Sequence, residues 1–192
     1  MKVCETQANF SMGCTVSYSF TRKFSTNFTS RQVETITCSW NEVMKQREVF
    51  GIGIYKLLLE SERELRKLFP KIVCYDNVER FTVDEEHLRR HALLVMDGIG
   101  FAVECLDDVG KLDHFLTMVG KRHYESRVPE RVLKKLWPAL DGSFTATLRD
   151  TYSREARKAW HFFFHYMVNV MKIGMNEAEM RDVSRRGRKL SD

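Results

Sequence analysis

Apolar residues recur at intervals of three and four from about residue 32 to residue 175, and this period constrains the fold more than any other feature of the chain. Such spacing gathers apolar side chains on one face of an α-helix. The 192 residues include only ten glycines and three prolines, too few for the many turns of a β-sandwich. The sequence therefore predicts an all-α domain of seven or eight helices over residues 32–175.

Both ends of the chain lack the sustained apolar period. Residues 1–31 are rich in Ser and Thr with scattered Phe, which predicts an irregular extension that is dispensable for folding. Residues 176–192 predict a charged tail, because Gly174 supplies a helix stop just before them.

Within the domain, the apolar stripes divide at turn and cap signals. A short helical turn should end at Phe69-Pro70, since proline disfavours helix in the residue before it, and 73–83 should form a loop. Asp84 is a candidate helix cap, Pro129 can open a helix that Pro138 kinks or ends, and residues 141–143 predict a turn. The stripes predict helices over about 32–44, 49–58, 84–106, 111–123, 129–140 and 151–174.

Charge and cysteine content exclude several function classes. The net charge is +5, but residues 32–175 contribute only +1, so no basic face for nucleic acid is indicated. No apolar run approaches the ~20 residues of a membrane span. The five cysteines form no CxxC pair, which favours free thiols over a zinc site or disulfides, and no signal-peptide core follows Lys2. These features predict a cytoplasmic protein.

Two histidines lie on apolar faces of consecutive predicted helices. His91 belongs to the stripe over 84–106 and His123 ends the stripe over 111–123. Either one alone is more typical of a hydrogen-bonded core histidine than of a ligand. Imidazole is a suitable iron ligand, and two of them on neighbouring helices could bracket a flat cofactor, although their spacing alone does not show one.

The sequence around these histidines resembles animal globins, especially nematode globins and the neuroglobin and cytoglobin branch. The resemblance rests on His91-Ala-Leu-Leu-Val-Met-Asp-Gly and Val119-Gly-Lys-Arg-His123, whose histidines are separated as in that family. Phe69 lies 22 residues before His91, where the family keeps a Phe that packs against heme. Trp40 and Ala159-Trp160 match positions in the first and last helices. The resemblance covers about 32–175 and implies the globin fold.

Gly51 gives this alignment a physical check. It lies 18 residues before Phe69, where the second helix of a globin crosses the fifth closely, and Ala92 lies at the facing position. A glycine within a helix costs roughly 1 kcal/mol relative to alanine, so a close crossing would explain its presence.

The resemblance implies a role for each site residue. His123 would be the proximal iron ligand and His91 the distal one, with Tyr55 on the distal side as a hydrogen-bond donor or as a packing residue. Leu94 stands where many globins place a basic residue for a heme propionate, so Arg90, Arg122, Lys121 or solvent must replace it. Without a CxxCH motif, the heme should be noncovalent heme b. The apolar pocket residues implied are Phe69, Val95, Val119, Val128, Leu133 and Leu136.

Several functions remain open at this point. The first is a bis-histidyl, hexacoordinate globin in electron transfer or redox and gas sensing, with a redox partner or O2, CO or NO. The second is a reversible oxygen carrier or store with an open sixth site. A heme-dependent enzyme lacks a substrate signature, and a heme-free interaction module would not need both histidines and Phe69.

Overall fold

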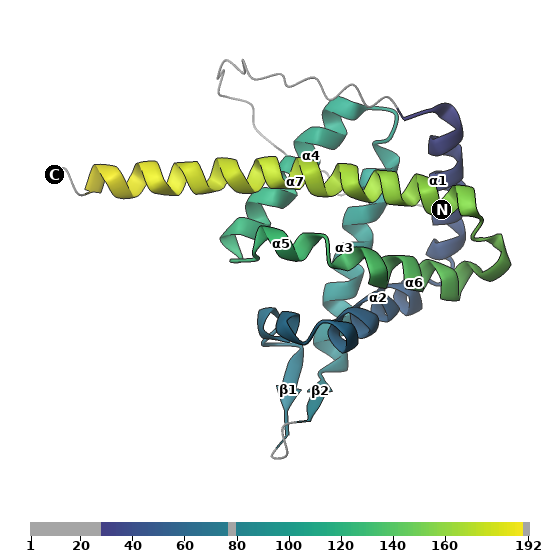
Figure 1. Ribbon diagram of the computed structural model, residues 1–192, viewed down its shortest axis with the longest axis horizontal. Coiled ribbons are helices and arrows are strands. Elements are labelled where there is room, and N and C mark those ends of the chain that lie inside the picture. Colours follow the sequence, from purple (N-terminus) through teal and green to yellow (C-terminus); the bar gives the residue numbers. More distant parts are fainter. Residues whose placement is uncertain (1–27, 77–79, 190–192) are drawn as a thin grey trace, which may run out of the picture.

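A computed structural model describes residues 28–76 and 80–189 and shows a helical bundle (Figure 1). The predicted all-α architecture is confirmed, with seven α-helices among the described residues. They are α1 Ser30–Met44, α2 Arg47–Ser61, α3 Glu85–Glu104, α4 Val109–Glu125, α5 Glu130–Leu133, α6 Leu136–Leu148 and α7 Arg154–Lys189. Two short 3₁₀ helices, η1 Arg63–Leu68 and η2 Arg149–Thr151, join them. No helix within the described ranges is long and apolar enough to cross a membrane.

Helix α1 begins at Ser30, slightly earlier than predicted. Thr29 and Gln32 form a reciprocal capping box, which satisfies backbone donors that a helix start leaves open. Phe28 packs its ring edge-on against three aromatic rings of α7, with centroids 5.3–5.6 Å away. The end of the predicted 1–31 extension therefore belongs to the packed structure; residues 1–27 lie outside the described part.

The predicted loop over 73–83 is instead a β-hairpin. Strands β1 Val73–Tyr75 and β2 Phe81–Val83 pair antiparallel, and the hairpin projects from the body just before α3 (Figure 1). Arg66 of η1 stacks its guanidinium 3.6 Å from the ring centroid of Phe81, the first residue of β2, and this contact links the hairpin to η1. Asp84 caps α3 as predicted, accepting a hydrogen bond from the His87 amide at 2.9 Å.

The predicted helix over 129–140 is two helices that break at residues 134–135. The position follows from Pro138, whose ring would clash with the carbonyl of Lys134 in a continuous helix. The predicted turn at 141–143 is wrong, because these residues are part of α6. The buried Asp141 carboxylate accepts hydrogen bonds from Arg157 and Tyr152, and these contacts tie α6 to the start of α7.

The predicted helix stop at Gly174 is also wrong, since α7 continues to Lys189 and its end projects beyond the body (Figure 1). Gly174 is present for packing. A Cβ at this position would overlap the carbonyl oxygen of Thr117 in α4, and a Cβ at Gly120 would overlap that of Met171 in α7. The two glycines thus bring the backbones of α4 and α7 into contact.

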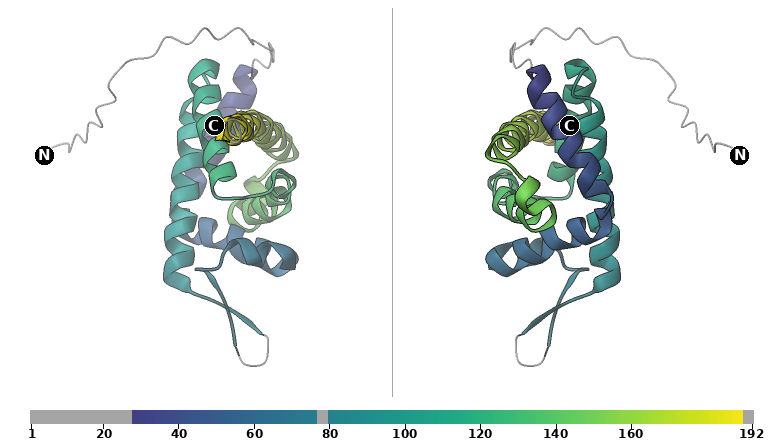
Figure 2. Two further views of the ribbon diagram at one scale, coloured as in Figure 1. Left: turned by 90° about the vertical axis from the view of Figure 1, so that its left-hand side faces the viewer. Right: turned by 90° about the vertical axis from the view of Figure 1, so that its right-hand side faces the viewer.

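All seven α-helices contribute buried side chains to the core, including Leu112 and Leu116 of α4. Figure 2 views α7 nearly end-on with α1 and α3 upright around it. Trp160 is fully buried and donates a hydrogen bond from Nε1 to the Ser39 hydroxyl at 2.8 Å. A Cβ at Gly51 would lie 2.9 Å from Met96 Cγ and 3.4 Å from Ala92 Cβ. The predicted close crossing of the second helix with the helix that carries His91 is confirmed.

Candidate functional site

The side chains of Tyr55, Phe69 and His91 contact one another beside the first half of α3. The His91 ring contacts Tyr55 of α2 at a centroid distance of 4.9 Å and Phe69, just after η1, at 5.5 Å. Tyr55 and Phe69 also contact each other, at 5.7 Å. All three contacts are edge-on, so the His91 imidazole is held between two rings and its rotation is restricted.

Tyr55 is the most deeply buried member of this cluster, with 5% of its surface exposed. Burial raises the pKa of its phenol, so the hydroxyl stays protonated throughout the physiological range. Within residues 28–76 and 80–189 the structure gives this hydroxyl no hydrogen-bond partner, which leaves it able to donate to a small molecule near His91.

His123 lies in the last full turn of α4, and a backbone contact fixes its tautomer. Its Nδ1 lies 2.8 Å from the carbonyl oxygen of Val119, one turn earlier. A carbonyl only accepts, so Nδ1 carries the proton and donates it. Nε2 then keeps its lone pair, which is the arrangement that a metal-ligating histidine needs.

His91 and His123 are electrostatically coupled although they belong to different helices. Burial lowers the pKa of His91, and the charge on His123 lowers it further. His91 is therefore neutral at pH 7 and also has a lone pair to donate. Two imidazoles, His91 from α3 and His123 from α4, form the chemical centre of the site.

The remaining predicted pocket residues lie on the elements around the two histidines. Val95 follows His91 by one turn, and Val128 donates its backbone N–H to the His123 carbonyl at 3.0 Å. Most of these apolar side chains pack only partly against the core, although Leu133 is 8% exposed. The set is Phe69, Val95, Val119, Val128, Leu133 and Leu136, drawn from six separate segments of the chain.

The basic residues considered for propionate binding differ in what they already contact. Arg90 pairs with Glu86 at 3.4 Å, and Lys121 pairs with Glu177 of α7 at 2.8 Å. Arg122 is exposed and forms no ion pair in the described part of the chain. Leu94 is 67% exposed and offers an anion nothing but an apolar surface.

Residues 52–171 match the globin family, which is more than half of the chain. The chain belongs to the globin family. It is similar to neuroglobin of Tetraodon nigroviridis, with 27% identity over 145 residues that cover 76% of this chain and 91% of the relative. It is also 26% identical to cytoglobin-1 of Oryzias latipes, covering 69% of this chain and 75% of that protein.

The fold is shared with solved structures as well. A protein described as a hexacoordinated heme protein from an anhydrobiotic tardigrade superposes with a TM-score of 0.69 at 21% identity. The superposition covers 77% of this chain and 95% of that one. As a globin, this chain is a heme protein.

The residues present fit a heme group. No cluster of three or more His, Cys, Asp or Glu side chains that could hold a metal occurs in the described ranges, so protein side chains alone would leave most coordination positions of an iron empty. Two imidazoles on neighbouring helices, one of them with its Nδ1 proton donated to a backbone carbonyl, fit a metal whose other ligands come from a flat macrocycle. The half-buried apolar side chains around them fit its hydrocarbon faces.

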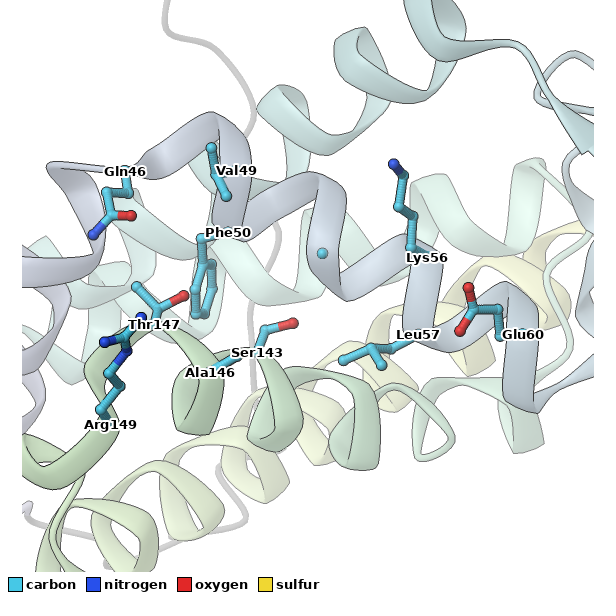
Figure 3. Close-up of a pocket in the computed structure, with 11 residues that line it drawn as sticks. Gln46, Val49, Phe50, Lys56, Leu57, Glu60, Ser143, Ala146, Thr147 and Arg149 are labelled. Carbon is cyan, nitrogen blue, oxygen red and sulfur yellow. The ribbon is translucent and has the colours of Figure 1, made fainter.

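An open groove of about 570 Å³ lies elsewhere, between α2 and α6 (Figure 3). Phe50, Leu57 and Ser143 line its floor, and none of the predicted site residues contributes to it. It uses the opposite face of α2 from Tyr55 and brings no histidine or cysteine together. The groove is therefore separate from the heme site.

The residue patterns did not predict how α4 packs against α7. Gly120 lies within the quoted motif, but its role against Met171 appears only when α4 and α7 are placed together. Tyr166 of α7 also donates a hydrogen bond to Asp113 of α4. Two glycines on the apolar faces of helices were the available signal, since each costs helix stability unless a close approach requires it.

Proposed function

We propose that this globin binds one noncovalent heme b, with His123 as the proximal ligand and His91 as the sixth ligand, and acts in electron transfer or in redox and gas sensing. The observation that carries the proposal is the pair of electrostatically coupled imidazoles on α3 and α4, in which His123 donates a hydrogen bond from Nδ1 to the Val119 carbonyl. The tardigrade protein with the same fold, described as a hexacoordinated heme protein, supports the proposal that the iron has a sixth ligand.

When bound, heme supplies an iron that changes its oxidation state and accepts two axial ligands. The chain's own contribution is to hold those ligands still. The Val119 carbonyl orients His123 and raises the basicity of its Nε2. Tyr55 and Phe69 restrict the His91 ring, so the same two side chains can serve both oxidation states with little rearrangement. This property suits one-electron exchange.

The pocket residues would exclude water from the macrocycle, and Arg122 is the basic residue most available for a propionate. Arg90 and Lys121 would first have to leave the carboxylates of Glu86 and Glu177. We therefore propose that Arg122 supplies the main propionate contact from the chain.

A carrier or store of oxygen is the second candidate, and Tyr55 is the observation that favours it. Its buried, protonated hydroxyl lies beside His91, where it could donate a hydrogen bond to dioxygen. Such a bond slows the release of a gas ligand. In this alternative His91 would not bind the iron, and the sixth coordination position would be open to the gas.

A cytoplasmic location is proposed on the cysteines. Cys38, Cys74 and Cys105 are free thiols in the described structure, with Cys105 buried. Free thiols persist in a reducing compartment. Fractionation of cells that express the full chain would check this location.

The function is tested with heme-reconstituted wild type and the His91→Leu and His123→Gly variants. We expect His91→Leu to retain heme but to bind carbon monoxide at least ten times faster, because no internal ligand has to leave first. His123→Gly should lose heme more readily, and added imidazole should slow that loss by replacing the missing ligand.

His114→Leu is the matched control, because His114 is an exposed histidine on the same helix as His123. It should leave both carbon monoxide binding and heme retention unchanged. If His91→Leu binds carbon monoxide at the wild-type rate, the sixth position is already open and the carrier function is favoured. Unchanged heme retention in His123→Gly would contradict the proximal assignment.

A further inference from the structure

A second pair of histidines lies on α7, apart from the heme site. His161 and His165 are one helical turn apart, so their side chains lie on the same face. Their Nε2 atoms are 3.1 Å apart, and their ring centroids are 4.3 Å apart. Neither residue contacts His91 or His123, and nothing in the proposed heme chemistry uses them.

The separation of the two Nε2 atoms matches the bite of a chelating pair. Imidazole nitrogens bind Zn²⁺ at about 2.0–2.1 Å, and Cu²⁺ lies in the same range. Two nitrogens 3.1 Å apart at that bond length subtend an angle of about 95–100° at the metal. This value lies between the square-planar and tetrahedral angles, so neighbouring positions of one ion can be filled with small ring rotations.

The surroundings hold the pair in place without enclosing it. Trp137 of α6 packs edge-on against His161 at 4.9 Å, and Phe164 packs against His165 at 5.8 Å. His161 is exposed and His165 is half-buried, so solvent can reach the nitrogens and supply further ligands. The histidine pair is packed against aromatic rings on one side and open to solvent on the other, which suits an ion that keeps part of its water shell.

Lys134 is a charged neighbour of the pair from outside α7. Burial lowers the pKa of His165, with smaller contributions from His161 and from Lys134, which lies between α5 and α6. This shift favours the neutral form of His165, whose ring then has one nitrogen lone pair to offer a metal. Lys134 therefore opposes a bound cation.

We infer that His161 and His165 form a surface binding site for a late first-row divalent cation, with Cu²⁺ held most tightly. The order follows from the ligands, since nitrogen sites favour Cu²⁺ over Ni²⁺ and Zn²⁺ in the ordinary affinity series. One Nε2 carries the proton of the hydrogen bond between the two rings, and on binding that ring changes tautomer, with the proton moving through solvent to its Nδ1. Both Nε2 atoms then have lone pairs, and two metal–nitrogen bonds replace the hydrogen bond. The ion would join successive turns of α7 without touching the heme ligands.

The test uses the ferric, heme-loaded full chain and Cu²⁺ alone as the probe. Titration followed by electron paramagnetic resonance should show one Cu²⁺ site with a splitting pattern from two nitrogens. His161→Ala and His165→Ala should each weaken this binding at least tenfold, while the heme absorption spectrum stays unchanged. His114→Ala, which removes an isolated exposed histidine from α4, should bind Cu²⁺ like the wild type.

Lys134→Ala provides an independent arm, because it removes repulsion without touching a ligand. It should bind Cu²⁺ two- to threefold more tightly than wild type. Far-ultraviolet circular dichroism verifies that each variant is folded. Equal Cu²⁺ binding by wild type and the His161→Ala/His165→Ala double variant would overturn the site, as would a signal from a single nitrogen.

Discussion

Replacement of Gly120 by alanine should destabilise this globin, against the usual preference of helices for alanine. In an ordinary helix the change would gain about 1 kcal/mol. Here the new Cβ would lie 2.9 Å from Met171 Cα and closer still to its carbonyl group. Ordinary contact needs about 3.4 Å or more. Backbone atoms cannot rotate away as a side chain can, so α4 and α7 must separate.

The expected loss of stability is the cost of the clash with Met171 minus the gain in helix propensity. Overpacking typically costs about 1–3 kcal/mol, and a clash with backbone belongs at the upper end of that range. After the gain in helix propensity, Gly120→Ala should lower the free energy of unfolding by about 2 kcal/mol. For a chain of this size, that corresponds to a midpoint lower by about 4–8 °C.

Gly98→Ala is the matched control, since its nearest new neighbour would be Phe115 Cζ at 4.0 Å. It should raise stability by about 0.5–1 kcal/mol, the opposite sign. Urea and thermal unfolding followed by circular dichroism measure both variants. Gly120→Ala should also release heme faster, because α4 carries His123. A Gly120→Ala protein as stable as wild type would refute the backbone contact between α4 and α7.

Three further predictions concern other parts of the chain. A chain that begins at Phe28 should match the full chain in stability, whereas one that begins at Arg31 should lose about 1–3 kcal/mol in urea unfolding, because it lacks the cap and the Phe28 ring. The pKa of His91 lies below its usual 6.5 in the folded state, so the heme-free protein should lose stability as the pH falls from about 6.5 through that lower value. His91→Leu should remove this part of the pH dependence, and an unchanged profile would contradict it. Arg122→Gln should speed heme transfer to an acceptor protein more than Arg90→Gln does, and equal rates would argue against Arg122 as the propionate contact.

The helical class could be predicted because it depends on a local period. Phe69 was identified from its distance to His91 and Tyr55 from the position that the resemblance gives it, and the structure brings all three into contact. Gly51 and Ala92 could be predicted because a glycine within a helix calls for a packing reason, and the facing position was known from the resemblance.

The errors share a cause: tertiary contacts overrode local preference. The local sequence predicts a helix stop at Gly174. In the structure this glycine lies within a continuous helix, where it allows the close contact with Thr117. Residues 141–143 read as a turn, yet Asp141 is held in α6 by partners 11 and 16 residues later. The hairpin over 73–83 likewise depends on pairing between two three-residue strands, which is too short a pattern to distinguish from a loop.

The central claim is that His91 and His123 both bind the heme iron. The most direct test is the absorption spectrum of the ferrous wild-type protein, purified with heme and kept free of oxygen and added ligands. The account predicts a low-spin, six-coordinate spectrum that becomes high-spin and five-coordinate in His91→Leu. A wild-type ferrous spectrum that is already high-spin and five-coordinate would contradict it.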